Sequence, residues 1–294
     1  MMNLEFYENF FESALLQCGI LAEVQSYEFV AGGCINVAAK VQTNKGTFFI
    51  KWNEHENAIE MFDAEAKGLE TLKKTNTFRV PEVIGVGKVV EKSFLLLEYI
   101  GFGVKRKDFW EIFGWQLAQL HRNTSSQFGL HFDNFIGSLP QKNTFHDSWH
   151  TFYFEERLRP QMELAYYQQL IDKSYLYKLD KLEKATEDLF PQEPPALLHG
   201  DLWHGNFLVS PDGIPVLIDP AIYYGHREME LSFMKWLGGF DDTVFQVYSN
   251  CYPLFSNFVQ RISLYQLYPI IVHLNLFGIS YLPSLVQVFQ SYSL

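Results

Sequence analysis

Hydrophobic and polar positions in the first hundred residues alternate with a short period between two helical stretches. Residues 4–18 have a helical pattern, and "SYEFVA", "VAAKVQT" and "TFFIKWN" then read as strands, the last two joined by the turn "NKG". Residues 57–74 have helical composition, and "EVIGVGKVV" and "FLLLEYI" form a second predicted hairpin around "EKS". The pattern predicts a small, mainly antiparallel β lobe over residues 1–100.

The pattern changes after Gly101 and predicts mainly helices to the end of the chain. Residues 108–123, 154–187 and 253–290 are the longest helical segments, and one strand pair interrupts them around 206–219. We therefore expect an α+β protein in which a larger, mainly helical lobe (101–294) follows the β lobe, with a hinge near residues 98–103. The most apolar stretch, 267–282, contains Pro269, His273 and Asn275, which favours a buried helix over a membrane span.

Composition narrows the class of protein. Hydrophobic residues make up 48% of the 294 residues and charged residues 19%, enough apolar content for a substantial core. The net charge of −11 argues against nucleic acid as a partner, because phosphate-backbone binding needs an excess of Lys and Arg. The three cysteines lack metal-ligand spacing, and the acidic N-terminal stretch does not resemble a signal peptide. These features predict a cytoplasmic protein with no membrane partner, and they leave the oligomeric state open.

The stretch "HGDLWHGN" (199–206) concentrates polar side chains directly before the predicted strand pair "NFLVS" and "PVLID". Asn206 and Asp219 are equidistant from the midpoint between Asp212 and Gly213, so we expect them side by side at the open end of the hairpin. Asp201 lies five residues before Asn206. Carboxylate and amide oxygens are hard ligands that suit Mg²⁺ better than zinc. The segment therefore predicts a carboxylate base beside a magnesium site.

The N-terminal lobe offers the residues of a phosphate site. Gly32 and Gly33 form a bend between two predicted strands, where backbone N–H groups can approach phosphate oxygens. Lys51 ends a strand in "FFIKW". Glu65 shares a largely apolar helix face with flanking residues of 61–72, and a carboxylate that points inward needs a partner. We expect that partner to be Lys51; the alternative is that Lys51 and Glu65 form a surface pair.

The order Lys51, Glu65, "LLLEYI", Asp201, Asn206 and Asp219 resembles the protein-kinase-like layout. "HGD" and "DPA", where protein kinases have His-Arg-Asp and Asp-Phe-Gly, are typical of small-molecule phosphotransferases related to aminoglycoside and choline kinases. Longer motifs restrict the resemblance to one family of these phosphotransferases. The motifs "HGDLWHGN", "IDPAIYYGHREMEL", "LGGF", "DNFIGSLPQKNTFHDSWHTFYFEERLRPQ" and "HLNLFGISY" resemble the fructosamine kinase (ketosamine kinase) family over nearly the whole chain, from about residue 32 to residue 281.

The resemblance implies a two-lobe kinase fold and ATP-dependent phosphorylation of the 3-hydroxyl of a ketosamine, which repairs glycated amines. Asp201 would orient and deprotonate the hydroxyl, and Asn206 and Asp219 would hold Mg²⁺. ATP and a ketosamine, free or on a protein lysine, would be the partners. The hinge would offer backbone groups to adenine; its residues are Glu98, Tyr99 and Ile100.

The resemblance also implies roles for residues near the two metal ligands. Trp203 would form a flat wall for the sugar or else be a core residue. His204, where the family usually has Ser, could contact substrate or cap the loop. His199 is expected to brace the loop. The segment with Tyr224, His226 and Arg227 would brace the catalytic loop and border the substrate, or else be a solvated turn.

Glu230 and Cys34 lead to two further expectations. Glu230 stands where the family usually has Asp, and we expect the longer acid still to brace the loop. Cys34 lies in the Gly-rich loop, where N–H groups could favour a thiolate and make ATP binding redox-sensitive, or it is simply a small apolar residue.

Three alternative functions stay open from the sequence. One is a kinase of another small alcohol, such as an aminoglycoside or choline. Another is a non-catalytic pseudokinase, although that class loses residues such as Lys51, Asp201 or Asp219. A metal hydrolase could be drawn from His199, Asp201, His204 and His226, but their spacing matches no recognised metal-ligand pattern.

Overall fold

The computed structural model describes residues 2–30 and 36–294, with side chains from Tyr7 onward. The chain forms two compact units. Unit 1 consists of Met1–Phe109 and Gly205–Pro220, and unit 2 of Trp110–His204 and Ala221–Leu294. The hairpin expected to carry the magnesium ligands thus belongs to the same unit as the N-terminal β lobe.

Unit 1 contains a five-stranded antiparallel sheet with the order β1-β2-β3-β5-β4. Both predicted hairpins are present, and helices occupy the two stretches where the pattern predicts them. The elements are α1 (Met2–Gln17), β1 (Val24–Phe29), β2 (Val37–Thr43), β3 (Gly46–Asn53), α2 (Ala58–Lys74), β4 (Val83–Val89) and β5 (Lys92–Glu98).

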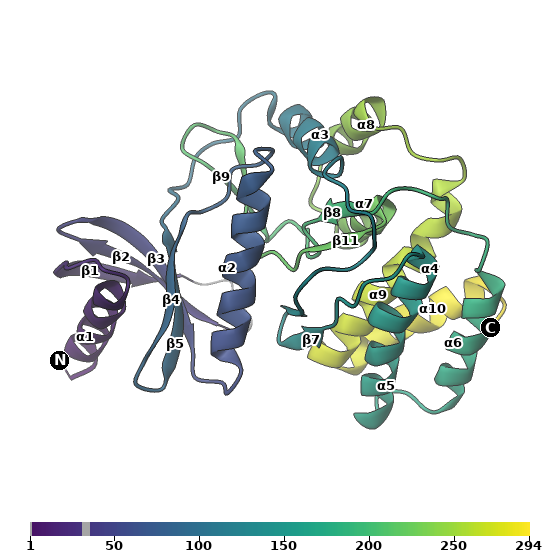
Figure 1. Cartoon of the computed structure of the whole chain (residues 1–294), viewed down its shortest axis with the longest axis horizontal. Helices are drawn as coiled ribbons and strands as arrows, with labels where there is room; N and C mark the ends of the chain where they lie inside the picture. Colours follow the sequence, from purple (N-terminus) through teal and green to yellow (C-terminus); the bar gives the residue numbers. More distant parts are fainter. Residues whose placement is uncertain (1, 31–35) are drawn as a thin grey trace. The chain divides into compact units, whose positions relative to one another are not determined.

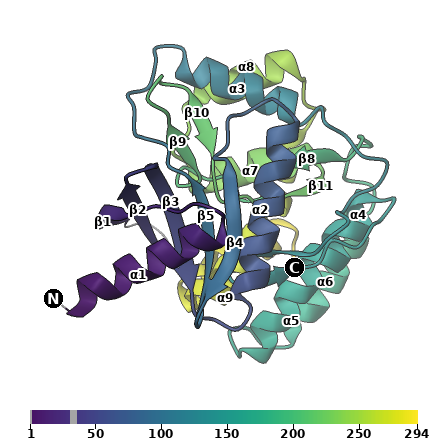
Figure 2. The same cartoon turned by 60° about the vertical axis from the view of Figure 1, so that its left-hand side comes forward.

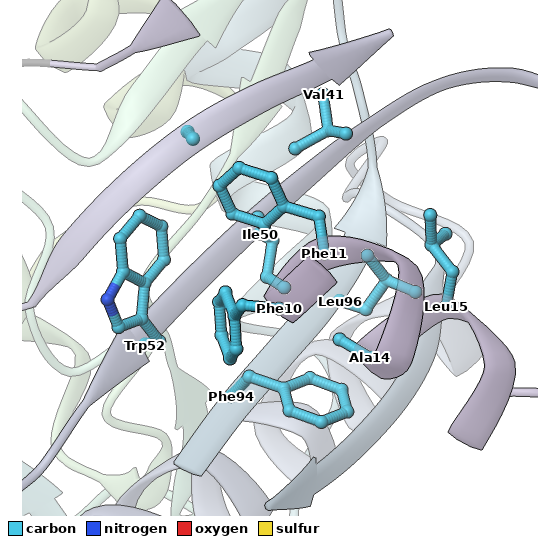
Figure 3. Packing of buried hydrophobic residues seen from close by; sticks show 10 residues of the cluster. Phe10, Phe11, Ala14, Leu15, Val41, Ile50, Trp52, Phe94 and Leu96 are labelled. Carbon is cyan, nitrogen blue, oxygen red and sulfur yellow. The ribbon is translucent and has the colours of Figure 1, made fainter. Parts of the chain in front are cut away.

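The two faces of this sheet are covered by different helices (Figure 1). Ile50 and Trp52 of β3, with Phe94 and Leu96 of β5, pack against Phe10 and other apolar residues of α1 (Figure 3). Because side chains alternate along a strand, Lys51 must point to the opposite face, where α2 lies. The same alternation that builds the core under α1 therefore directs the lysine toward α2.

The strands β9 (Phe207–Val209) and β10 (Pro215–Leu217) pair as predicted, and Figure 2 shows them side by side. Their register differs from the expected one by one residue. Leu217 lies opposite Phe207, so that Ile218 rather than Asp219 is level with Asn206, and Ile218 N donates to the Asn206 carbonyl at 3.1 Å. The hairpin is tied to the 101–106 segment, because Gly103 N donates to the Val209 carbonyl and Arg106 N to the Gly213 carbonyl.

Unit 2 is mainly helical, with two short strand pairs that the pattern did not predict: β6 with β7 and β8 with β11. Its elements are α3 (Phe109–Leu120, which begins at the unit boundary), β6 (Asn134–Ile136), β7 (Leu139–Gln141), α4 (Trp149–Phe152), the π-helix η1 (Tyr153–Leu158), α5 (Arg159–Tyr167), α6 (Ser174–Ala185), β8 (Ala196–Leu198), β11 (Tyr223–Gly225), α7 (Arg227–Leu237), α8 (Asp242–Cys251), α9 (Phe258–Phe277), the 3₁₀ turn η2 (Ile279–Tyr281) and α10 (Leu282–Ser291).

The two longest predicted helices, 154–187 and 253–290, are each divided. Gln169 adopts φ 59° and ends α5, with Leu170 N bonded to the Ala165 carbonyl across the left-handed residue. Gly278, at φ 90°, ends α9, and α10 then begins with a proline in its first turn. In the described part of the chain, no helix combines the length and apolarity needed to cross a membrane; the cytoplasmic location stays a prediction.

Candidate active site

Lys51 is the centre of an ion cluster within unit 1. Its ammonium lies 2.7 Å from Glu65 Oε1 and 2.7 Å from Asp219 Oδ1. The lysine and Glu65 side chains are largely buried, at 6% and 13% exposure, whereas Asp219 is 47% exposed. The structure thus brings together three residues that are far apart in the sequence, and it confirms Lys51 as the partner of Glu65.

Burial and charge act in opposite directions on this cluster. Burial by itself lowers the pKa of Lys51, but the carboxylates of Asp219 and Glu65 raise it above its ordinary value, so the lysine stays protonated. Burial raises the pKa of Glu65 to about 7, because the attraction of one ammonium shared with Asp219 does not outweigh desolvation. The Glu65 carboxyl therefore keeps its proton to higher pH than an exposed glutamate does, because burial raises its pKa.

Asp219 reaches Lys51 from an unusual backbone conformation. Its φ is 54°, in the left-handed region that Asp adopts more readily than most residues other than glycine. Asn206, on the other strand of the hairpin, is 5% exposed. The hairpin therefore provides one exposed carboxylate and one buried amide, both oxygen donors.

The hinge residues follow β5. The Glu98 carboxylate accepts a hydrogen bond from Arg79 Nη2 at 2.7 Å and from Glu82 N at 3.2 Å, so its side chain fastens the 79–82 segment. Ile100 is buried, and Tyr99 is half-buried with the Lys40 ammonium 5.4 Å from its ring centre. The side chains of these three residues therefore make structural contacts within unit 1.

Glu230 of α7 binds the start of the predicted catalytic loop (residues 199–206). Its carboxylate accepts hydrogen bonds from His199 N at 3.2 Å, Gly200 N at 2.8 Å and His121 Nε2 at 2.9 Å. Burial by itself raises the pKa of Glu230, but the bond and charge of His121 and the loop donors bring it below its ordinary value. The longer acid braces the loop as expected, and His121, which the sequence reasoning missed, is its partner.

The remaining loop residues are arranged around Asp201. His199 is fully buried, and its Nδ1 accepts a hydrogen bond from Asp201 N at 3.3 Å, which confirms its bracing role. Asp201 and Trp203 are half-buried, and His204 is exposed. The rings of Trp203 and His204 meet edge to face at 4.9 Å. The loop therefore presents an acid and two rings on a rigid backbone.

Gly200 allows the loop to approach the backbone of Ala221, which precedes β11. Its φ is 84°, and a Cβ at this position would lie 2.0 Å from the Ala221 carbonyl oxygen. We expect Gly200→Ala to displace the loop and abolish turnover, with a lowered Tm, because both the conformation and the space exclude a side chain. Gly238→Ala is the matched control, since Gly238 has φ 69° but open space around it. Equal turnover in the two variants, measured beside thermal unfolding, would contradict this account.

The predicted substrate residues after Pro220 need a correction. His226 and Arg227 are 1% and 2% exposed. His226 caps α7, and burial together with the adjacent Arg227 lowers its pKa to about 3. Arg227 pairs with Glu193 at 2.5 Å and lies 3.7 Å from the centre of the Tyr252 ring. Both side chains are enclosed by unit 2, so they brace the interior and do not support a substrate contact.

Tyr224 differs from these two residues because it is half-buried on β11.

Gly32, Gly33 and Cys34 lie outside the described residues. Among the described residues, no three His, Cys, Asp or Glu side chains are grouped so as to hold a metal.

Comparisons with known proteins agree with this layout. The family model described as Fructosamine kinase matches residues 12–293. The chain is 38% identical over 283 residues to a chloroplastic protein-ribulosamine 3-kinase of Arabidopsis thaliana, covering 95% of this chain and 86% of the relative. It is 39% identical over 259 residues to a protein of Synechocystis sp. named Probable ketoamine kinase, covering 88% of this chain and 87% of the relative.

Solved structures show the same relationship. A protein from Haemophilus somnus that carries the name fructosamine-3-kinase superposes with a TM-score of 0.85 at 29% identity, covering 94% of each chain. An aminoglycoside phosphotransferase, at 15% identity and a TM-score of 0.60 over 97% of this chain and 99% of its own, shares the protein-kinase-like fold. The matched family model, the relatives and the geometry together show that this chain belongs to the fructosamine kinase family.

Proposed function

We propose that this chain transfers the γ-phosphoryl group of ATP to the 3-hydroxyl of a ketosamine. The observation that carries the proposal is the Lys51 cluster, in which one buried ammonium is within 2.7 Å of both Glu65 and Asp219 in a chain of the fructosamine kinase family. Such a lysine is a fixed positive charge for phosphate oxygens, and its two acids hold it in place.

Asp201 is the proposed catalytic base. It orients the acceptor hydroxyl and takes its proton as the oxygen attacks the γ-phosphorus, while ADP leaves. Its backbone is fixed through His199, and the loop before it is held by Glu230. Because its backbone is already fixed, little conformational entropy is lost when the Asp201 side chain is positioned for the reaction.

Mg²⁺ is the proposed metal, and the donor set of the hairpin fits it. Asn206 and Asp219 provide amide and carboxylate oxygens, and one Asp219 oxygen stays with Lys51. When bound, the ion would neutralise charge on the phosphates. Asn206 and Asp219 are the residues that would hold it.

The other predicted contacts remain part of the proposal. The backbone of Glu98, Tyr99 and Ile100 would bind adenine, and Gly32 and Gly33 the phosphates. Trp203, His204 and Tyr224 would contact the acceptor. Residues 1–100 and 101–294 would act as the two kinase lobes in a cytoplasmic enzyme.

Ribulosamines and fructosamines are the proposed substrate class, with the amine free or on a protein lysine. Relatives named protein-ribulosamine 3-kinase match 95% of this chain at 38% identity. The sugars differ by one hydroxymethyl group, a difference that binding discriminates only modestly.

The test is Mg²⁺-dependent ATP consumption with ribulose-lysine, fructose-lysine, an aminoglycoside and choline, with product phosphorylation checked by mass spectrometry. We expect turnover with the ketosamines and none with the other two. Turnover with only the aminoglycoside or choline would make the chain a kinase of another alcohol. Binding of nucleotide without turnover of any acceptor would instead support a pseudokinase.

A further inference from the structure

A group of buried polar side chains in unit 2 lies outside the residues with assigned roles. We call it the amide cluster and define it as Asn134, Gln141, Asn143 and Arg157. All four are at most 4% exposed. The β6–β7 hairpin places Asn134 directly opposite Gln141, and Asn143 follows two residues later. All four residues belong to the long motif that begins at "DNFIG", so these polar positions of the motif are buried in unit 2.

Hydrogen bonds connect the members of the amide cluster to one another. The Asn134 amide oxygen accepts from Gln141 Nε2 at 2.8 Å and from Asn143 Nδ2 at 2.9 Å. The Asn143 oxygen accepts from Arg157 Nη2 at 2.6 Å. In a buried environment these bonds fix each amide in one orientation, because every alternative leaves a polar group unsatisfied.

Arg157 anchors one end of the cluster on η1. Its guanidinium lies 4.1 Å from the centre of the Tyr223 ring and 4.5 Å from that of Phe152, and Nη1 donates to the Lys142 carbonyl at 2.5 Å. No described carboxylate forms an ion pair with it. A fully buried cation held by ring faces and neutral oxygens is costly to desolvate. Stability by itself is therefore a weak explanation for its presence.

The other end of the cluster binds the backbone that follows Pro220. Asn134 Nδ2 donates to the Ile222 carbonyl at 2.8 Å, and Gln141 Nε2 also donates to the Ala221 carbonyl at 3.2 Å. That same Ala221 oxygen is the atom that a Cβ on Gly200 would approach to 2.0 Å. Ala221 N in turn donates to the His199 carbonyl at 2.9 Å. The segment that the cluster holds, just before β11, is therefore in direct contact with the predicted catalytic loop through both the N–H and the carbonyl of Ala221.

We propose that the amide cluster is a positioning device for the catalytic loop: by fixing the Ala221 and Ile222 carbonyls, Asn134 and Gln141 set where Gly200, and so Asp201, can lie. Glu230 fixes the loop through its N–H groups, and the amide cluster fixes it through the neighbouring segment 221–222. The catalytic consequence rests on the proposed function, whereas the positioning itself does not.

The first variant is Gln141→Met, which keeps the side-chain length and removes both donors. We expect kcat for the ketosamine to fall on the order of 100-fold, as for a misplaced catalytic group, with the KM for ATP changed less than threefold because Lys51, Glu65 and Asp219 belong to unit 1. Hydrogen exchange followed by mass spectrometry should show at least tenfold faster exchange in peptides that contain the Gly200 and Ala221 amides, and unchanged exchange in α9.

A gentler pair of variants covers the case in which Gln141→Met does not fold. Tyr268 Oη donates to Gln141 Oε1 at 2.7 Å, while Tyr265 Oη, one turn earlier on the same helix and equally buried, has no hydrogen-bond partner among the described residues. Tyr268→Phe should lower kcat roughly fivefold to tenfold and speed exchange at Gly200 and Ala221, as expected for the loss of one buried bond. Tyr265→Phe should do neither.

Unchanged exchange at Gly200 and Ala221 in the folded variants would overturn the positioning role. Faster exchange with unchanged kcat would overturn its importance for catalysis. If the wild-type protein turns over no ketosamine, the proposed function has failed, and the exchange comparison between Tyr268→Phe and Tyr265→Phe still decides whether the cluster positions the loop.

Discussion

Replacing Asp201, the proposed base, with asparagine should lower kcat for ketosamine phosphorylation by roughly 10²- to 10⁴-fold, the range for loss of a general base. Asparagine keeps the size of the side chain and the backbone bond from Asp201 N to His199, so the loop itself should stay in place. The amide cannot take the proton of the hydroxyl. We expect unchanged Tm and unchanged nucleotide affinity, measured by thermal unfolding and by titration with a non-hydrolysable ATP analogue.

Asp188→Asn provides the matched control, because Asp188 is an exposed carboxylate of the same unit and the chemical change is identical. Its turnover should equal that of the wild type. A variant Asp201→Asn that retains more than a tenth of wild-type kcat would show that Asp201 is not the base. A collapse of Tm in the same variant would indicate a structural role instead.

The placement of Lys51 and Glu65 could be predicted because it follows from local periodicity. A strand alternates its faces and a helix repeats every 3.6 residues, so one polar residue in each apolar pattern points toward a partner. Ile50 and Trp52 are buried against α1, and Lys51 between them has to face α2. Once β3 and α2 are expected to pack together, the ion pair between Lys51 and Glu65 follows.

The predicted register of the β9–β10 hairpin was wrong because it took the pairing to be symmetric about the midpoint between Asp212 and Gly213. The structure has a five-residue connection instead, closed by bonds between Ser210 and both Gly213 and Ile214. Asp219 therefore lies one residue beyond the partner of Asn206. A side-chain hydroxyl that closes a loop leaves no clear spacing signal in the sequence.

The unpredicted parts of unit 2 depend on contacts between distant segments. Pro269 lies inside α9 and leaves the Tyr265 carbonyl without its helical N–H partner. The hydroxyl of Tyr153, more than a hundred residues earlier, donates to the Leu264 and Tyr265 carbonyls and offsets that loss. Gln169 ends α5 in a conformation that usually requires glycine or asparagine. In the same way, the burial of His226 and Arg227 depends on Glu193 and Tyr252, which no local pattern connects with them.

The Lys51→Met substitution should have the second large effect. It should also make the free energy of unfolding depend more strongly on pH, and a second substitution at Glu65 should remove that dependence. Loss of a fixed cation aimed at phosphate should lower kcat/KM for ATP roughly 10²- to 10³-fold. The substitution also leaves Glu65 buried without its ammonium, which raises the Glu65 pKa further above the wild-type value of about 7.

The sign of the stability effect follows from proton binding. Between the unfolded pKa of Glu65 and its raised folded pKa, the folded chain binds more protons than the unfolded chain. Stability therefore falls as pH rises through this window, by up to about 1.4 kcal/mol per pH unit. Lys51→Met widens the window upward, so the variant should lose stability relative to wild type most strongly between pH 7 and pH 9, as measured by urea unfolding.

Adding Glu65→Gln to Lys51→Met removes the titrating group while the cation stays absent. The double variant should recover stability at pH 8, show little gain at pH 5, and remain as inactive toward ATP as the single variant. Lys67→Met, on the exposed side of α2, is the control and should resemble wild type in both measurements. A stability difference between the single and double variants that is the same at pH 5 and pH 8 would show that Glu65 does not carry the buried charge. Recovery of activity in the double variant would show that Lys51 acts only by neutralising Glu65 and has no direct role in holding the nucleotide.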